Sequence, residues 1–204
     1  MERYLRSMEP SLEIQYASDE KNMPYGEKSG SEILRLTKQL IGAHKGEYDV
    51  LVPACNTMSV ALLGAGLTGP RVVDIITPTI RVLSRQHLRN LGVISTYYTH
   101  RSRMYSKSLH ALSMPSSSLA KLIEEGDKEK IQVELQAIIE PLKRRRVKRL
   151  ILGCTHYELV DYMIREMYPH LELLYPGKYQ AEAVMRRVQY PARYGLEPPR
   201  LFSK

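Results

Sequence analysis

The chain has few cysteines and no long run of apolar residues. Cys55 and Cys154 are the only cysteines in its 204 residues. Without a secretory signal beside them, they argue against a disulfide framework and for a reducing, cytoplasmic setting. The opening residues, 1–6, lack the apolar core of a signal peptide. No stretch has the roughly 18 consecutive apolar residues that indicate a transmembrane helix, so we expect no membrane span.

Acidic residues are outnumbered by basic ones, which gives a formal net charge of +8 at pH 7. The densest basic run, 143–149, contains no aromatic residue and belongs to no nucleic-acid-binding motif, so nucleic acid is not favoured as a partner. Its cations follow a helical pattern at 131–142, and the C-terminal end of a helix favours positive charge. A small anionic substrate would use the same positive field.

Short apolar segments alternate with helical patterns along most of the chain. This alternation predicts an α/β protein with mainly parallel sheets flanked by helices. We expect two similar lobes, one formed by residues 1–76 plus 175–204 and the other by 77–174, with the active site in the cleft between them. The expected strands lie at 12–17, 50–52, 71–76, 91–95, 147–152 and 171–174, and the main expected helices at 31–41, 78–87, 96–112, 131–142, 158–167 and 179–188, with a linker at 116–118.

The stretch 150–157, Leu-Ile-Leu-Gly-Cys-Thr-His-Tyr, places a cysteine and a histidine where a strand ends and a helix begins. Ligands bind at this carboxyl end of strands in open α/β sheets, and free N–H groups at a helix N-terminus favour thiolates. The stretch 50–57, Val-Leu-Val-Pro-Ala-Cys-Asn-Thr, repeats the arrangement. Cys55 and Cys154 therefore occupy equivalent positions, one in each expected lobe.

Two thiols that face each other suit a particular chemistry. One thiolate can remove a proton from carbon while the opposite thiol donates one to the other face, which inverts a stereocentre without a cofactor. A free thiol has a pKa of about 8.5, so each sulfur needs neighbours that tune it, and His156 is placed to do so for Cys154. The structural alternative is two inert buried thiols and a histidine that only caps a helix.

Metal binding and dithiol redox chemistry agree less well with the sequence. Cys154 and His156 form a single Cys-x-His pair, and one further cysteine cannot complete a convincing tetrahedral ligand set. Cys55 and Cys154 are far apart in sequence and form no Cys-x-x-Cys motif, which disfavours redox exchange between them. We therefore predict no bound metal.

Two motifs carry a family resemblance. The segments Ala54-Cys-Asn-Thr57 and Gly153-Cys-Thr-His-Tyr157 resemble the two signature motifs of the cofactor-independent aspartate/glutamate racemase family, most closely those of its glutamate-specific members. Supporting segments occur in the same order, and the likeness runs from about residue 12 to residue 188. These segments are Tyr16 with Asp19, Pro24-Tyr25-Gly26, 92–96 with Thr99, and 122–126.

The resemblance implies a role for each matching residue. Cys55 would be the acid/base that faces the D-enantiomer, Cys154 the one that faces the L-enantiomer, and His156 would assist Cys154. The residues expected to hold the substrate are Pro24, Tyr25, Gly26, Asn56, Thr57 and Thr155, and Thr99 and Glu124 fall in segments that line the family's site. Members of the family need no cofactor, make D-glutamate for peptidoglycan in the bacterial cytoplasm, and are commonly homodimers.

The chain also departs from the family pattern. The family opens with a strand that ends in Asp-Ser-Gly, which this chain lacks, so we expect lower burial at 12–17 and 50–52 than in the second lobe. Glu158 stands where the family has proline, and the usual acidic residue after the last strand is replaced around Tyr175 and Pro176. These departures keep two alternatives open: an inactive relative that binds a ligand or partner protein, and an aspartate racemase.

Overall fold

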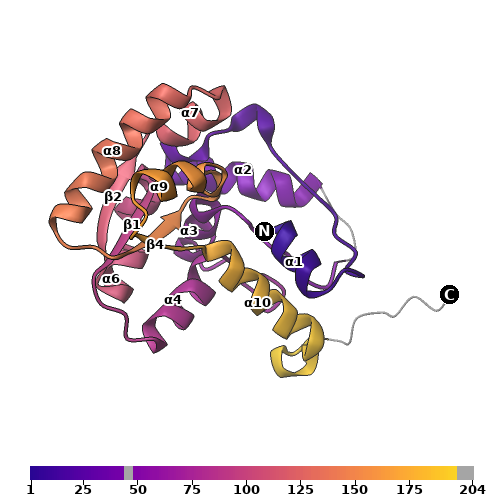
Figure 1. Ribbon diagram of the computed structural model, residues 1–204. Coiled ribbons are helices and arrows are strands. Elements are labelled where there is room, and N and C mark those ends of the chain that lie inside the picture. The colour runs from indigo at the N-terminus through magenta and orange to yellow at the C-terminus, as the bar shows by residue number, and fades with distance from the viewer. Residues whose placement is uncertain (44–47, 197–204) are drawn as a thin grey trace.

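The computed structural model describes residues 1–43 and 48–196. It contains a four-stranded sheet with the strand order β2-β1-β3-β4 and all neighbours parallel. Helices lie on both faces of this sheet (Figure 1), which confirms the predicted α/β class. The strands are β1 (Leu91–Thr96), β2 (Leu112–Ser116), β3 (Arg149–Gly153) and β4 (Glu172–Leu174).

The central strands are buried on both faces because their side chains alternate between two apolar clusters. Leu150 and Leu152 of β3 belong to the cluster beneath α7 (Leu119–Glu125), α8 (Lys128–Arg144) and α9 (Asp161–Met167). Ile151 points to the other face, where it joins residues of α4 (Ile76–Arg85) and α6 (Met104–Leu109). This period of two along a parallel strand explains the continuous apolar run in the sequence.

The first part of the chain is mainly helical. It contains α1 (Glu2–Met8), α2 (Gly30–Ala43) and α3 (Asn56–Gly64), with two short turns, η1 (Glu20–Asn22) and η2 (Tyr25–Glu27), between α1 and α2. The last long helix, α10 (Pro176–Gln189), packs against α1 (Figure 1) and is followed by a short turn, η4 (Pro191–Tyr194). α1 and α10 share an apolar cluster that contains Leu5, Val73 and Met185.

Three predicted strands of the first lobe differ in the structure. The strand expected at 12–17 is wrong, since that segment has no strand pairing among the described residues. The strands expected at 50–52 and 71–76 reduce to one parallel bridge between Leu51 and Val72. A strand needs a neighbour for its backbone N–H and C=O groups, and here the pairing is confined to that bridge. Residues 12–17 and 50–52 are less buried than Leu150–Leu152, which confirms the expected contrast.

The helix predicted at 96–112 is interrupted at Arg103 and ends three residues early, at Leu109. It divides into α5 (Tyr97–Ser102) and α6, because Arg103 between them adopts the left-handed conformation with φ 57°. The chain then enters β2, where we expected a helix end and a linker. β2 is an edge strand, which tolerates Pro115 because one side of the strand needs no hydrogen-bonding partner.

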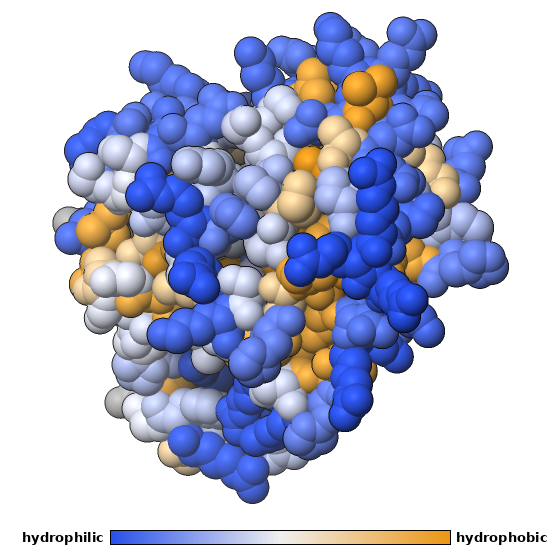
Figure 2. All heavy atoms as spheres, turned by 90° about the vertical axis from the view of Figure 1, so that its left-hand side faces the viewer, coloured by the Kyte–Doolittle hydropathy of each residue, from blue (hydrophilic) through white to orange (hydrophobic). Residues whose placement is uncertain are grey.

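The face of the molecule that carries α8 and β2 shows a band of apolar side chains among polar ones (Figure 2). A hollow of about 320 Å³ lies between the edge strand and the end of α8, lined by Leu112, Ser113, Met114, Pro141, Leu142, Arg144 and Arg145. The basic run was expected just past the helix end, but α8 continues to Arg144, so the run begins within its last turn, where Lys143 pairs with Glu140. None of the helices within residues 1–43 and 48–196 is long and apolar enough to cross a membrane.

Candidate active site

Cys154 follows β3 directly and stands at the N-terminus of a single turn, η3 (Thr155–Val160). Its side chain is buried, and the backbone N–H groups of His156 and Tyr157 point toward the sulfur. This is the predicted position at the carboxyl end of a central strand. Thr155, a predicted substrate-binding residue, is half-buried as the first residue of the turn.

His156 connects Cys154 to a carboxylate on another helix. Its Nδ1 atom lies 3.8 Å from the Cys154 sulfur, and its Nε2 atom lies 2.9 Å from Oε1 of Glu124 on α7. The two ring nitrogens therefore have different partners. An imidazole held in this way can take a proton on one side while a carboxylate stabilises the resulting charge on the other.

Cys55 occupies the N-cap position of α3 with an extended backbone, φ −118° and ψ 126°. It is half-buried. Burial raises the pKa of the Cys55 thiol, while the backbone N–H groups of Met58 and Thr57 and the Thr57 hydroxyl act in the opposite direction by favouring a thiolate. The sulfur thus sits where a helix N-terminus would stabilise a transient negative charge.

The two thiols influence each other. Burial, followed by the charge of Cys55, raises the pKa of Cys154 to about 12. A negative charge on one sulfur therefore opposes a second on the other, as expected of two acids that share a site. Both cysteines are free. The site consequently favours thiols, and a thiolate needs support from a nearby hydrogen-bond donor or cation.

A cluster of buried threonines joins α3 to the carboxyl end of β1. The hydroxyl oxygens of Thr57 and Thr96 lie 2.9 Å apart, and Thr96 donates to the Thr99 hydroxyl at 3.1 Å. Gly26 packs against this cluster, since a Cβ at that position would lie 2.6 Å from the Thr96 Cβ. The structure thus brings together the predicted residues Gly26, Thr57 and Thr99 around Thr96, which we had not predicted as a site residue.

Asn56, beside Cys55, is held by a residue that the sequence did not indicate. Its Oδ1 atom accepts a hydrogen bond of 2.7 Å from the Tyr105 hydroxyl, and both side chains are buried. Its Nδ2 atom is buried and has no hydrogen-bond partner among the described residues. Buried donors are normally paired, so this amide is suited to a ligand oxygen such as a carboxylate.

Pro24 and Tyr25 begin the η2 turn close to Cys55. The Tyr25 hydroxyl donates to Oδ2 of Asp19 at 2.6 Å, and this bond lowers the pKa of Asp19. Burial and the bond to Asp19 raise the pKa of Tyr25, with a further contribution from Cys55. Asp19 matched the family pattern in sequence but was not predicted as a site residue.

The described residues contain no group of three or more His, Cys, Asp or Glu side chains arranged to hold a metal ion. The Cys154, His156 and Glu124 side chains form a chain of contacts from sulfur to imidazole to carboxylate. Such an arrangement serves proton transfer.

Comparison with known proteins identifies the family. Residues 3–184 match the model of the family described as Asp/Glu/Hydantoin racemase. The glutamate racemase of Phenylobacterium zucineum (strain HLK1) is 34% identical over 198 residues, which cover 78% of this chain and 70% of the relative.

Solved structures of glutamate racemases share the fold of this chain. Glutamate racemase isoform RacE1 from Bacillus anthracis superimposes with a TM-score of 0.84 at 26% identity, over 93% of this chain and 77% of that one. Glutamate racemase from Francisella tularensis subsp. tularensis SCHU S4, solved in complex with D-glutamate, shares the fold with a TM-score of 0.79 at 24% identity, over 94% of this chain and 76% of that one. The fold and the sequence matches define an isomerase of the racemase type. The chain belongs to the aspartate/glutamate/hydantoin racemase family.

Proposed function

We propose that this protein interconverts L- and D-glutamate by proton transfer between Cys55, Cys154 and the α-carbon of the substrate, without a cofactor. The observation that carries the proposal is the placement of two free thiols, each at the N-terminus of a helical segment, with the imidazole of His156 beside Cys154. The relatives reported above are glutamate racemases, which favours glutamate as the substrate. The product would supply D-glutamate for peptidoglycan.

The proposed reaction moves one proton on each face of the α-carbon. Starting from L-glutamate, the Cys154 thiolate takes the α-proton, and the Cys55 thiol gives its proton to the opposite face. The enzyme is left with a Cys154 thiol and a Cys55 thiolate, so the number of protons is unchanged. Reacting atoms need separations of about 3–3.5 Å, which predicts roughly 6–9 Å between the two sulfurs. His156, with Glu124 behind it, would assist at Cys154.

The substrate would bind through polar groups on both sides of the thiols. The unpaired Nδ2 of Asn56 is the best-placed donor for a carboxylate. The Thr57 and Thr99 hydroxyls and the backbone of Pro24, Tyr25 and Gly26 would contribute further contacts on the Cys55 side, and Thr155 on the Cys154 side. The Francisella tularensis relative was solved with D-glutamate, which supports an amino acid of this size and charge.

The proposal extends to the organisation of the protein. Residues 1–76 plus 175–204 and residues 77–174 would act as two lobes, with substrate bound between Cys55 of the first and Cys154 of the second. Residues 197–204 of that division lie outside the described part of the chain. We also propose a homodimer that works in the cytoplasm.

Exchange of the α-proton with solvent deuterium, followed by NMR, tests the function. The wild-type protein should exchange both glutamate enantiomers and leave both aspartate enantiomers largely unchanged. Cys154→Ala should lose exchange that begins from L-glutamate, and Cys55→Ala exchange that begins from D-glutamate, because each sulfur reaches one face of the α-carbon. Loss of an acid/base group typically costs about 10²–10⁴-fold in rate.

Two results would contradict the proposal. Faster exchange with aspartate would indicate an aspartate racemase. A folded wild-type protein that exchanges neither amino acid would indicate the inactive, ligand-binding relative, and binding of D-glutamate measured by calorimetry would then identify it.

A further inference from the structure

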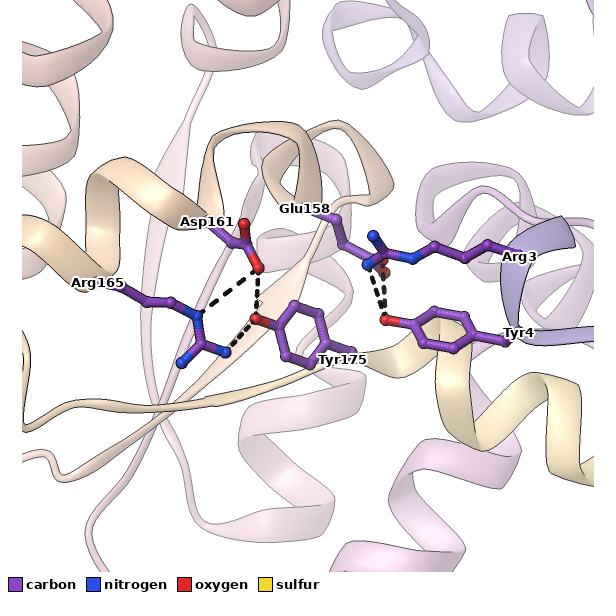
Figure 3. Close-up of polar contacts among 6 residues, drawn as sticks. All are labelled: Arg3, Tyr4, Glu158, Asp161, Arg165 and Tyr175. Carbon is purple, nitrogen blue, oxygen red and sulfur yellow. Dashed lines mark hydrogen bonds and ion pairs between the residues drawn. The ribbon is translucent and has the colours of Figure 1, made fainter. Parts of the chain in front are cut away.

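The turn that carries Thr155 and His156 is attached at its far end by two similar groups of side chains (Figure 3). In the first group, Oε2 of Glu158 accepts hydrogen bonds from Nη2 of Arg3 at 3.2 Å and from the Tyr4 hydroxyl at 3.3 Å. Arg3 and Tyr4 belong to α1, so this group joins the turn to a helix more than 150 residues away, with a separation of 155 from Arg3.

The second group acts on the residue that follows the turn. The Tyr175 hydroxyl donates to Oδ2 of Asp161 at 2.6 Å, and Arg165 donates to the same hydroxyl oxygen at 2.6 Å. Figure 3 shows the Tyr4 hydroxyl directed at the Glu158 carboxylate and the Tyr175 hydroxyl directed at the Asp161 carboxylate. A tyrosine, a carboxylate and an arginine therefore meet at Glu158 within the turn and again at Asp161 directly after it.

Glu158 differs in burial from Glu2, a paired carboxylate on α1. Its side chain is 9% exposed, against 44% for Glu2, which pairs with Arg6 on the solvent side of the same helix. Its Oε1 atom is buried and has no hydrogen-bond partner among the described residues. Gly177 at the start of α10 lies against it, since a Cβ there would be 3.1 Å from Oε1. A buried carboxylate is costly unless it is paired, and the N-terminal ammonium, Arg3 and Tyr4 offset that cost for Glu158.

The turn has little means of holding its own shape. A 3₁₀ turn of six residues has weaker hydrogen-bond geometry than an α-helix and depends on outside contacts. His156 stands two residues before Glu158, and its contacts to sulfur and to Glu124 depend on where the turn lies. A displacement of about 1 Å at an active site can cost roughly 10²-fold in rate.

We infer that Glu158, held by Arg3 and Tyr4 of α1, is a positioning residue for His156 and so for proton transfer at Cys154. The inference rests on the proposed function for its catalytic consequence. It gives α1 a role in one half of the reaction, because the polar contacts of Arg3 and Tyr4 fix the turn on the Cys154 side.

The kinetic test compares two variants with two matched controls. Glu158→Gln keeps the shape and removes the charge, and Arg3→Ala removes the partner, while Glu2→Gln and Arg6→Ala alter the exposed pair on the same helix. Each variant is assayed for α-proton exchange starting from L-glutamate and from D-glutamate. We expect Glu158→Gln and Arg3→Ala to slow exchange from L-glutamate. The decrease should be smaller than that caused by loss of an acid/base group, which is about 10²–10⁴-fold. Exchange from D-glutamate should be nearly unchanged. The controls should leave both rates as in the wild type.

A second measurement reports on His156 without requiring activity. In the ¹⁵N-labelled protein, the ring resonances of His156 are assigned by their loss in His156→Gln. They should shift in Glu158→Gln and Arg3→Ala and stay unchanged in the two controls. Urea unfolding of every variant shows which of them remain folded under the assay conditions.

The outcomes distinguish the proposed function from the positioning role of Glu158. Absence of exchange in the wild type contradicts the proposed function, while the histidine resonances still decide the positioning role. Equal loss of exchange from both enantiomers, or unshifted His156 resonances in folded Glu158→Gln and Arg3→Ala, would overturn the inference.

Discussion

The Nε2 atom of His156 lies 2.9 Å from Oε1 of Glu124, and this contact fixes which ring nitrogen faces the sulfur of Cys154. Glu124→Gln keeps an oxygen that can accept a hydrogen bond but removes the charge that would stabilise an imidazolium. We expect slower exchange from L-glutamate. The decrease should be smaller than that for loss of the thiol itself, which is about 10²–10⁴-fold. Glu125→Gln, which alters an exposed pair with Lys121 on the same helix, is the control. Equal rates in the two variants would exclude a role for Glu124.

The close approach of Gly26 to Thr96 predicts that residue 26 does not tolerate a larger side chain. A methyl group at residue 26 would lie 2.6 Å from the Thr96 Cβ, so Gly26→Ala must displace either η2 or the threonine cluster. Overpacking of this kind costs about 1–3 kcal/mol of unfolding free energy, and the KM for glutamate should rise because Thr57 and Thr99 move with Thr96. Urea unfolding and steady-state kinetics measure the two effects.

Gly42→Ala is the matched control for this change. Residue 42 lies within α2, and a Cβ there meets no atom within 4 Å. Alanine is favoured over glycine inside helices by roughly 0.5–1 kcal/mol, so this variant should be as stable as the wild type or more so, with an unchanged KM. A KM that rises equally in both variants would show that the Gly26 contact has no special role.

The hydrogen bond from Tyr105 to Asn56 predicts a substrate-binding defect. Tyr105→Phe leaves the buried Oδ1 of Asn56 without its donor, and an unsatisfied buried acceptor costs about 1–3 kcal/mol. The amide would then be free to turn, so KM should rise more than kcat falls. Tyr162→Phe changes an exposed tyrosine and should leave both constants unchanged. A normal KM in Tyr105→Phe would contradict the proposed role of Asn56.

The raised pKa of Cys154 predicts a loss of stability in alkaline solution. Folding raises this pKa from an ordinary value of 9.0 to about 12, so the folded state holds the thiol proton more tightly than the unfolded state does. The resulting stabilisation is complete below about pH 9 and is lost as the pH rises toward 12, by at most about 1.4 kcal/mol per pH unit.

Urea unfolding at a series of alkaline pH values measures this loss as the difference between the wild type and Cys154→Ala. Taking the difference removes the contribution of the tyrosines, whose titration is common to both proteins. The advantage of the wild type over the variant should shrink as the pH rises above 9. A constant difference between pH 8 and 10.5 would contradict the burial of the thiol.

The sequence predicted the Cys154 half of the site well because its signal is local. The run at 150–152 is buried on both faces of the sheet, and an apolar run followed by Gly153 and Cys154 needs no knowledge of distant residues. Helix ends were predicted less well. Ser29 accepts a hydrogen bond from the Glu32 N–H, and α2 begins one residue before the expected 31. Asp74 accepts from the N–H groups of Ile76 and Thr77, and α4 begins two residues before the expected 78.

Other features could not be predicted from local patterns. β2 contains Pro115 and polar residues because an edge strand has one unpaired side, so it resembles a loop in sequence. Thr96 meets Thr57 across 39 residues, and Tyr105 meets Asn56 across 49. The sequence around each of these residues contains no pattern that marks a site residue. They belong to the site only because α3 packs against β1 and α6.

The mutual effect of the two sulfurs has a consequence for the enzyme between turnovers. In a two-thiol reaction, release of D-glutamate leaves the proton on Cys154, and release of L-glutamate leaves it on Cys55. A second negative charge is disfavoured, so in the proposed reaction the protein leaves each turnover as one of two isomers, which differ only in which sulfur holds the single proton. Each isomer accepts one enantiomer, and it is the enantiomer just released. At high substrate concentration, the rate at which solvent returns that proton to the other sulfur would set the pace of racemisation.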